Sequence, residues 1–329
     1  MSSSRGANEG ERAGVSRRSF LVGAGASMLL ACRSRIAGVR LGFMTNLTHA
    51  PAMVGAATGR LQEALGIGVD ARSFRAGPRV LEALIGGAID VGVAGPSAIV
   101  YNNARHGAGT LRLVSGCCSG GASFVVSPRS GIRGWEDLRG KTLATTQIGT
   151  TQDISLRQYL HKHGYVPAER GGDVTVTALD AATILAEMRR GALDGAWMAE
   201  PWATRLVGEA DGVRLVDERD LWPDRRFPTA LVVARGDWAR EHPDVIARLG
   251  AAMDAEVRRA REMPDETRRV VGDELARLLG KRVPDPLLAA AWPYVDFTTD
   301  PLLTALDTIA DDASALGLAP RSSHATLTG

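Results

Sequence analysis

Small hydroxyl and amide side chains gather where an apolar segment meets a helical pattern. Residues 145–153 read Thr-Thr-Gln-Ile-Gly-Thr-Thr-Gln-Asp and follow the apolar run 142–144. Thr150 with Asp153 three residues later is typical of a helix N-terminus, and Gly149 allows a sharp turn before it. The free N–H groups and the dipole of a helix N-terminus attract anions. This segment therefore predicts an anion-binding turn, and a helix cap that binds nothing is the alternative.

Two earlier segments have the same form. Residues 46–51 and 95–97 each follow a strand-like run, and each carries a proline where the first residue of a helix is expected. None of the three turns contains Lys or Arg. This favours an anion held by hydrogen bonds and helix dipoles rather than by full charges. A sulfonate fits, because it offers three acceptor oxygens and stays ionised at physiological pH.

A fourth turn, residues 199–202, adds a carboxylate and aromatic surface. Trp197 and Trp202 are expected to cover a short organic tail of the ligand. Glu200 is expected to face an amine, because a carboxylate in an anion site otherwise repels its ligand. The alternatives are that Trp197 lies in the core and that Glu200 caps a helix or pairs with an Arg. For His49, a hydrogen bond to the ligand and a role as a helix cap both stay open.

These turns require strands and helices to position them. From residue 36 the sequence alternates strand-like and helical segments, then restarts the pattern at residue 132. The expected strands are 36–44, 68–74, 91–94, 111–115, 122–127, 142–144, 173–179, 193–198, 213–216 and 229–234. This order predicts two α/β units with mostly parallel sheets, and ligands in such sheets lie at the carboxyl ends of the strands. After them come helices at 244–262, 264–279, 286–292 and 301–316, a tail without a sheet of its own.

The predicted architecture has two lobes joined by a two-strand hinge. The chain is expected to cross between the lobes near residues 123–128 and again near 229–234, and the helical tail is expected to pack on the first lobe. A cleft between the lobes would then be lined by strand-to-helix turns from both. The predicted parts are a leader (1–31), the first lobe (32–122), the second lobe (123–228) and a return to the first lobe (229–329).

The first residues predict export. Arg17 and Arg18 resemble the pair of a twin-arginine signal, and an apolar run, 21–30, follows them. That run is too short to span a bilayer comfortably. Residues 29–32, Leu-Leu-Ala-Cys, resemble a lipobox with Cys32 as the acylated residue. The prediction is an extracytoplasmic protein held at the membrane by lipid on Cys32; a disordered basic tail beside a chance cysteine is the alternative.

Composition excludes several classes of function. The chain has 329 residues, 45% of them hydrophobic, which is enough for a large core or for two smaller ones. Its formal charge of +2 is carried by the leader, so the remainder is neutral and a nucleic-acid partner is not expected. No catalytic triad, P-loop or Cys/His metal spacing occurs, so no enzyme activity, metal or cofactor is expected. Cys117 and Cys118 are interpreted as buried thiols.

An ordered set of motifs then suggests a family. The motifs are LEALIGGAIDVG (81–92), WEDLRGK (135–141), GTTQD (149–153), MRRGALDGA (188–196) and EPW (200–202). Together they resemble the type II periplasmic-binding-protein receptors of ABC importers, in the group that binds nitrate, taurine and aliphatic sulfonates. The resemblance covers about residues 36–243. Some sulfonate receptors of this group carry Asp-Pro where this chain has Glu200-Pro201, which leaves the role of Glu200 open.

The resemblance implies a receptor that closes on its ligand by hinge motion. It implies a monomer without a cofactor that delivers a small organic anion to an ABC permease and its ATPase. Nitrate or bicarbonate, and a thiamine precursor or riboflavin, are alternative ligands; a thiamine-pyrimidine synthase-like enzyme and a ligand-sensing transcription-factor domain are alternative functions, both disfavoured by the leader. The implied ligand contacts are Asn46, Thr48, His49, Pro96, Ser97, Gly120, Gly121, Thr150, Thr151, Gln152, Trp197, Glu200 and Trp202.

Overall fold

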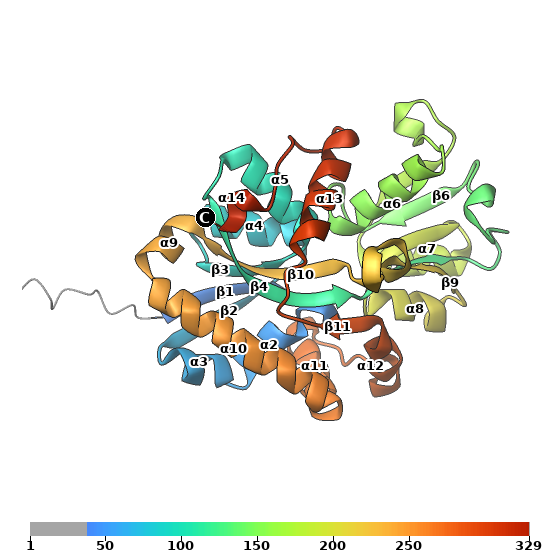
Figure 1. Cartoon of the computed structure of the whole chain (residues 1–329). Helices are drawn as coiled ribbons and strands as arrows, with labels where there is room; N and C mark the ends of the chain where they lie inside the picture. The colour runs from blue at the N-terminus through green and yellow to red at the C-terminus, as the bar shows by residue number, and fades with distance from the viewer. Residues whose placement is uncertain (1–37, 329) are drawn as a thin grey trace, which may run out of the picture. The chain divides into compact units, whose positions relative to one another are not determined.

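Two β-sheets organise residues 38–328, the part of the chain that the computed structural model describes (Figure 1). The first sheet has the order β11-β4-β10-β3-β1-β2 and the second has the order β7-β6-β8-β5-β9. The strands of the first sheet are β1 (Gly38–Met44), β2 (Gly68–Phe74), β3 (Val91–Ala94), β4 (Leu111–Gly120), β10 (Pro228–Arg235) and β11 (Val295–Phe297). Those of the second are β5 (Ala122–Val126), β6 (Thr142–Thr145), β7 (Thr175–Ala178), β8 (Gly195–Ala199) and β9 (Val213–Asp217).

Each sheet is parallel on one side only. β1 pairs in parallel with β2 and β3, and β6 pairs in parallel with β7 and β8. β10 runs antiparallel to β3 and β4, and β5 runs antiparallel to β8 and β9. The expectation of mostly parallel sheets is therefore correct for three strands of each sheet and wrong for the others. The reason is that the chain passes directly from one sheet to the other at β4–β5, without the helical crossover that a parallel neighbour needs.

Helices follow the parallel strands, and most begin where the sequence marks a start. Proline occupies the first or second position of α2, α4 and α5, and Asp180 caps α7 by accepting hydrogen bonds from two backbone N–H groups. The helices that lie between the strands in the sequence are α2 (Ala50–Ala57), α3 (Arg60–Leu65), α4 (Gly77–Ile85), α5 (Pro96–His106), α6 (Thr151–Lys162), α7 (Ala181–Arg190) and α8 (Trp202–Glu209). The later ones are α9 (Gly236–Glu241), α10 (Pro243–Glu262), α11 (Pro264–Leu279), α12 (Asp285–Ala291), α13 (Leu303–Ala315) and α14 (Ala325–Thr328).

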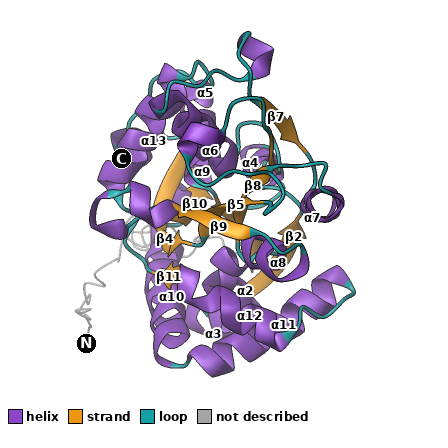
Figure 2. Cartoon of the chain, turned by 90° about the vertical axis from the view of Figure 1, so that its right-hand side faces the viewer, coloured by secondary structure: helices purple, strands orange, loops and turns teal. Residues whose placement is uncertain are grey.

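The helices cover both faces of the first sheet. Figure 2 shows α2, α3, α10, α11 and α12 gathered on one side of the strands, with α5 and α13 on the other. On the side of α5 and α13, an apolar cluster packs Val80, Leu81 and Leu84 of α4 together with Leu306 of α13. The second sheet has its own clusters, including a stacked pair formed by Phe124 and Trp197. Each sheet therefore has a separate apolar core.

The chain changes sheet at Gly121 and again between β9 and β10. The first change lies between β4 and β5, slightly before the predicted range 123–128. Gly121 has a φ of 75°, and a Cβ atom there would lie 2.8 Å from side-chain carbons of both Thr48 and Val295. Only glycine fits this crossing without displacing its neighbours. The second connection carries two short 3-10 helices, Glu218–Leu221 and Pro223–Arg225.

The tail differs from its prediction in two ways. It contributes a strand, β11, which pairs with β4 at the edge of the first sheet. It also reaches the second lobe, because Ala313 and Leu316 at the end of α13 pack on Ile154 of α6. Gln158 of α6 donates a hydrogen bond of 2.6 Å to Asp312. Among residues 38–328 no helix combines the length and the apolarity needed to cross a membrane, and the predicted leader with Cys32 lies outside the described residues.

Candidate ligand-binding site

One cavity of about 830 Å³ lies at the carboxyl ends of the parallel strands of both sheets. The turns after β1, β2 and β3 line it from the first sheet, and those after β6, β7 and β8 line it from the second. The six turns each lead to a helix N-terminus, so six sets of helical N–H groups and dipoles surround the same space. The lining residues are Met44, Thr45, Asn46, Thr48, His49, Ser73, Phe74, Arg75, Ala76, Gly77, Pro78, Gly95, Ala98, Thr146, Gln147, Thr150, Thr151, Gln152, Asp180, Ala181, Ala182, Met198, Ala199, Trp202, Thr229, Leu278 and Leu279.

The N-termini of α5 and α6 meet across the two sheets. A Cβ atom on Gly95 would lie 2.5 Å from Oγ1 of Thr151, so a larger residue at position 95 would displace that side chain. Thr151 is only 4% exposed and its hydroxyl has no partner among the described residues. A buried hydroxyl without a partner carries a free-energy cost that a ligand oxygen can remove. Thr151 is therefore the clearest unoccupied hydrogen-bonding group of the cavity.

The turn before α6 is held by Asp153 and not by the capping pattern that the sequence indicates. Thr150 makes no side-chain bond to the helix; its hydroxyl donates to the carbonyl of Gln147 at 2.8 Å. The buried Asp153 carboxylate instead accepts from Gly149 N at 2.9 Å, from Thr145 Oγ1 at 3.0 Å and from Arg157. The first N–H groups of α6 are thus left without a side-chain cap beside the cavity.

The turn after β1 contributes neutral donors. Asn46 caps the 3-10 helix Leu47–His49, because its Oδ1 accepts from Thr48 N at 3.1 Å and leaves its amide NH₂ without an intramolecular partner among the described residues. His49 is buried, and burial lowers its pKa to about 3, so the ring is neutral. The backbone N–H of Met44 donates to His49 Nδ1 at 3.3 Å, which assigns the ring proton to Nε2. His49 makes no side-chain cap to α2, so the geometry favours the donor role over the cap.

Apolar side chains line the remainder of the cavity. Phe74 lies at the end of β2, Met198 and Trp202 lie on either side of the turn between β8 and α8, and Leu278 and Leu279 come from the end of α11. Arg205 lies over the Trp202 ring with its guanidinium carbon 4.3 Å from the ring centroid, which fixes the indole orientation. The cavity therefore combines a polar region of helix N-termini with an apolar wall, as expected for an organic anion.

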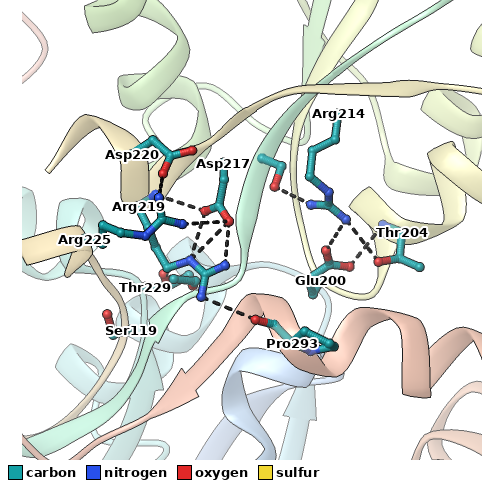
Figure 3. A network of polar contacts seen from close by, with 12 residues as sticks. Ser119, Glu200, Thr204, Arg214, Asp217, Arg219, Asp220, Arg225, Thr229 and Pro293 are labelled. Atoms are coloured by element: carbon teal, nitrogen blue, oxygen red, sulfur yellow. Dashed lines mark hydrogen bonds and ion pairs between the residues drawn. The ribbon is translucent and has the colours of Figure 1, made fainter.

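Six of the predicted contacts lie outside the lining residues. Glu200 is 0% exposed and pairs with Arg214 at 2.8 Å, while its other oxygen accepts from Thr204 N at 3.0 Å (Figure 3). Burial raises the pKa of Glu200, and Arg214 opposes that rise. Arg214 also stacks on Tyr294, 3.5 Å from the ring centroid. Glu200 therefore fits the alternative interpretation, a helix cap that is also the partner of an Arg, and its carboxylate is not among the groups that line the cavity.

Trp197 fits its alternative as well. It is fully buried in the second core, and its Nε1 donates to Glu218 at 2.5 Å. Pro96 starts α5 just behind the cavity, and Gly120 and Gly121 lie at the crossing between the sheets. Ser97 lines a separate cavity of about 100 Å³, which also contacts Thr151. The other predicted contacts, Asn46, Thr48, His49, Thr150, Thr151, Gln152 and Trp202, line the main cavity.

Two lining turns were missed by the sequence reasoning. Residues 73–78 follow β2, and 180–182 follow β7. A signal for both was available, because each lies between a strand and a helix that the sequence does predict. The same rule that selected the other turns, that ligands lie at the carboxyl ends of parallel strands, selects these. Leu278 and Leu279 gave no comparable signal, since their place depends on how α11 packs.

Two cysteines lie within residues 38–328. Cys117 and Cys118 are free, buried thiols on β4, and burial raises the pKa of Cys117 to about 12. Such thiols are inert at neutral pH. Within residues 38–328 no group of three or more His, Cys, Asp or Glu side chains is placed to hold a metal ion.

Similar proteins share both the sequence pattern and the fold. Residues 34–274 match the model of the NMT1-like family. A protein of Brucella abortus (strain 2308), named as a binding protein without a ligand, is 29% identical over 217 residues, 66% of this chain. The match spans 65% of that relative's length. The taurine-binding periplasmic protein of Escherichia coli (strain K12) is 28% identical over 243 residues, which are 74% of this chain and 72% of that protein.

Solved structures support the fold. The alkanesulfonate-binding protein SsuA of Xanthomonas axonopodis pv. citri, bound to MOPS, matches with a TM-score of 0.73 and 21% identity. That match covers 89% of this chain and 98% of SsuA. The nitrate-binding protein NrtA of Synechocystis PCC 6803 matches with a TM-score of 0.73 and 15% identity, covering 89% and 84%. The predicted fold class is confirmed, and this chain belongs to the NMT1-like family, with the two-sheet α/β fold of periplasmic binding proteins.

Proposed function

We propose that this protein is the extracytoplasmic substrate-binding component of an ABC importer and that it captures a small organosulfonate. The observation that carries the proposal is the ring of six helix N-termini around one cavity, with neutral donors on Asn46, His49 and Thr151. Such donors suit an anion whose charge is spread over three oxygens. The relatives named for taurine, alkanesulfonate and nitrate agree with an anion as ligand.

The apolar wall favours an organic ligand over bare nitrate or bicarbonate. An ion as small as nitrate or bicarbonate cannot cover the side chains of Phe74, Met198 and Trp202. An alkyl or aryl tail can bury its apolar surface against them. A thiamine precursor or riboflavin would use the same wall, but neither exploits the anion-attracting helix ends as fully. The delivery partners are then a permease and its ATPase, and the protein acts as a monomer.

A thermal-shift screen followed by calorimetry tests the ligand class. We expect ethanesulfonate and its longer homologues to raise the melting temperature by mass action, with affinities in the micromolar range, about −8 kcal/mol. Propionate, which has one acceptor oxygen fewer, is the matched control and should bind at least tenfold more weakly. Binding of nitrate, a thiamine precursor or riboflavin without any sulfonate would assign the cavity to another ligand.

We propose further that lipid on Cys32 anchors the protein after export by the twin-arginine route. The proposal rests on Arg17, Arg18 and the Leu-Leu-Ala-Cys motif. Cys32→Ala should remain uncut and lose labelling by a fatty-acid analogue, whereas Cys117→Ala, a matched cysteine on β4, should be cut and labelled as the wild type is. A wild-type protein that stays unlabelled in the cytoplasm would refute the anchor.

A further inference from the structure

Arg75 is the arginine among the residues that line the cavity. It lies in the turn between β2 and α4 and lines the cavity. Its neighbours in the sequence are paired: Arg72 contacts Asp70 at 2.5 Å, and Arg79 contacts Glu82 at 2.9 Å. Arg75 makes no hydrogen bond or ion pair with any residue in the described part of the chain. Its guanidinium is therefore available to a ligand.

Neither of the other ionisable side chains of the cavity wall pairs with Arg75. Among its lining residues these are His49 and Asp180. His49 is neutral because burial lowers its pKa to about 3. Asp180 is occupied at the start of α7: it accepts from Ala182 N at 3.1 Å, from Thr183 N at 3.0 Å and from the Thr183 hydroxyl. These bonds, led by the one from the Thr183 side chain, lower its pKa, so Asp180 stays ionised; its carboxylate is bonded at the start of α7 and forms no ion pair with Arg75.

An organosulfonate with a single charge leaves Arg75 unused. Its oxygens can be held where α5 and α6 meet, at Gly95 and Thr151, by neutral donors alone. Glu200, which was expected to receive an amine, is buried against Arg214. The wall therefore offers a free cation where a zwitterionic ligand would need a free carboxylate.

We propose that Arg75 selects ligands that carry a second anionic group, such as sulfocarboxylates and disulfonates, over monoanionic and zwitterionic sulfonates. This inference rests on the proposed function, because it assigns the second end of the same ligand. The planar guanidinium donates two parallel hydrogen bonds to a carboxylate or sulfonate, which a lysine or an amide does not match. A cavity of about 830 Å³ has room for both ends and a short linker.

Calorimetry with four probes of similar size tests the proposal. The probes are ethanesulfonate, taurine, sulfoacetate and ethane-1,2-disulfonate. The wild type should bind the two dianions about tenfold or more tightly than ethanesulfonate, as a charge-assisted hydrogen bond predicts. Arg75→Gln should remove that advantage and change ethanesulfonate binding less than about twofold. Added salt should lower the affinity for the dianions more steeply in the wild type than in Arg75→Gln.

Arg79→Gln is the matched control. It removes an exposed arginine from the same segment, one that pairs with Glu82 and does not line the cavity. Its affinities for all four probes should equal those of the wild type. Equal weakening of all probes by Arg75→Gln would overturn the proposal, because Arg75 would then hold the first sulfonate.

The remaining outcomes separate this inference from the proposed function. Binding of ethanesulfonate with no advantage for the dianions, or tightest binding of taurine, would overturn the inference and leave the organosulfonate receptor intact. Failure of all four probes to bind would overturn the proposed function and, with it, the role of Arg75.

Discussion

The two walls of the cavity treat charge differently. The wall from the first sheet, made by the turns after β1, β2 and β3, has no carboxylate among its lining residues. It carries Arg75, which forms no ion pair within residues 38–328. On the side of the second sheet, each of the three helix N-termini has a carboxylate. These are Asp153 at α6, Asp180 at α7 and Glu200 at α8.

Every one of these carboxylates is already bonded on its own side. Asp153 pairs with Arg157, Asp180 caps α7 and Glu200 pairs with Arg214. A carboxylate at a helix N-terminus satisfies N–H groups and offsets the dipole. The second sheet therefore uses its acids for its own stability. Side-chain caps are absent from α2, α4 and α5 beside the first sheet and, beside the second, from α6. An acid next to an anion site is therefore not by itself a ligand contact.

The largest expected effect is that of Glu200→Ala. It leaves the largely buried Arg214 without its carboxylate, and breaking a buried ion pair in this way costs about 3–5 kcal/mol of unfolding free energy. Urea unfolding measures the loss, and Glu200→Gln, which keeps an acceptor, should lose less. In Glu200→Gln the affinities for all sulfonates should fall by the same factor, with no additional loss for taurine. A loss below about 1 kcal/mol in Glu200→Ala would show that the pair is not a structural one.

Glu218, on the side of the second sheet, is a buried carboxyl that forms no ion pair within residues 38–328. Burial raises the pKa of Glu218 from 4.5 to about 7, although Ser155 and Trp197 donate hydrogen bonds to it. The folded protein therefore holds this proton more tightly than the unfolded chain. The resulting stabilisation is complete below pH 4.5 and is lost as the pH rises to about 7, by roughly 3 kcal/mol.

Glu218→Gln should remove that pH dependence. Relative to the wild type, its unfolding free energy should rise between pH 4.5 and pH 7, the window set by the shift. Glu209→Gln is the control, and it should change the pH dependence of the unfolding free energy in the opposite direction. The reason is that the hydrogen bond from Arg205 lowers the pKa of Glu209. Parallel stability profiles for Glu218→Gln and the wild type would contradict the prediction.

Thr151→Val should separate binding from stability. The hydroxyl of Thr151 is buried without a partner among residues 38–328, so its isosteric removal should not lower the unfolding free energy and should raise it by about 1 kcal/mol. Sulfonate affinity should fall about three- to tenfold, the value of one hydrogen bond. Thr145→Val is the matched control: it loses a buried bond to Asp153 outside the cavity, and should reduce stability more than affinity. A destabilised Thr151→Val with normal affinity would contradict the assignment.

The smallest expected effect is that of Asp180→Ala. Loss of this cap should cost about 0.5–1 kcal/mol of unfolding free energy, and Asp180→Ser, which can still cap α7, should recover most of it. Removing a negative charge from the wall should also strengthen anion binding slightly, less than about threefold. Thermal unfolding and calorimetry measure the two effects. Weaker anion binding in Asp180→Ala would mean that Asp180 positions the ligand.

Local signals in the sequence predict much of the fold. Helix α11 is predicted at 264–279 and observed as Pro264–Leu279, because a proline starts it and a glycine follows its end. Strand β11 was missed because three residues, Val295–Phe297, are too few to show a periodicity. Its existence depends on β4 offering a free edge, which no local pattern reveals.

The site was predictable to the level of turns but not of side chains. All four turns chosen from the sequence line the cavity, through residues such as Asn46, Gly95, Thr151 and Trp202. Glu200 could not be assigned, because its partner Arg214 is brought beside it only by the pairing of β5 with β8 and β9. Arg75 was missed because the turn after β2 lacks the hydroxyl pattern that drew attention to the others.

The order in which the strands enter the sheets bears on how the chain is assembled during synthesis. The second sheet is made from one uninterrupted stretch, Ala122–Asp217, whereas the first sheet holds β10 between β3 and β4. Until residues 228–235 have been made, β3 and β4 have unpaired edges at the centre of their sheet. Exposed strand edges invite pairing with other chains. The half of the molecule that begins first therefore finishes last, and the nascent chain exposes these edges until residues 228–235 have been made.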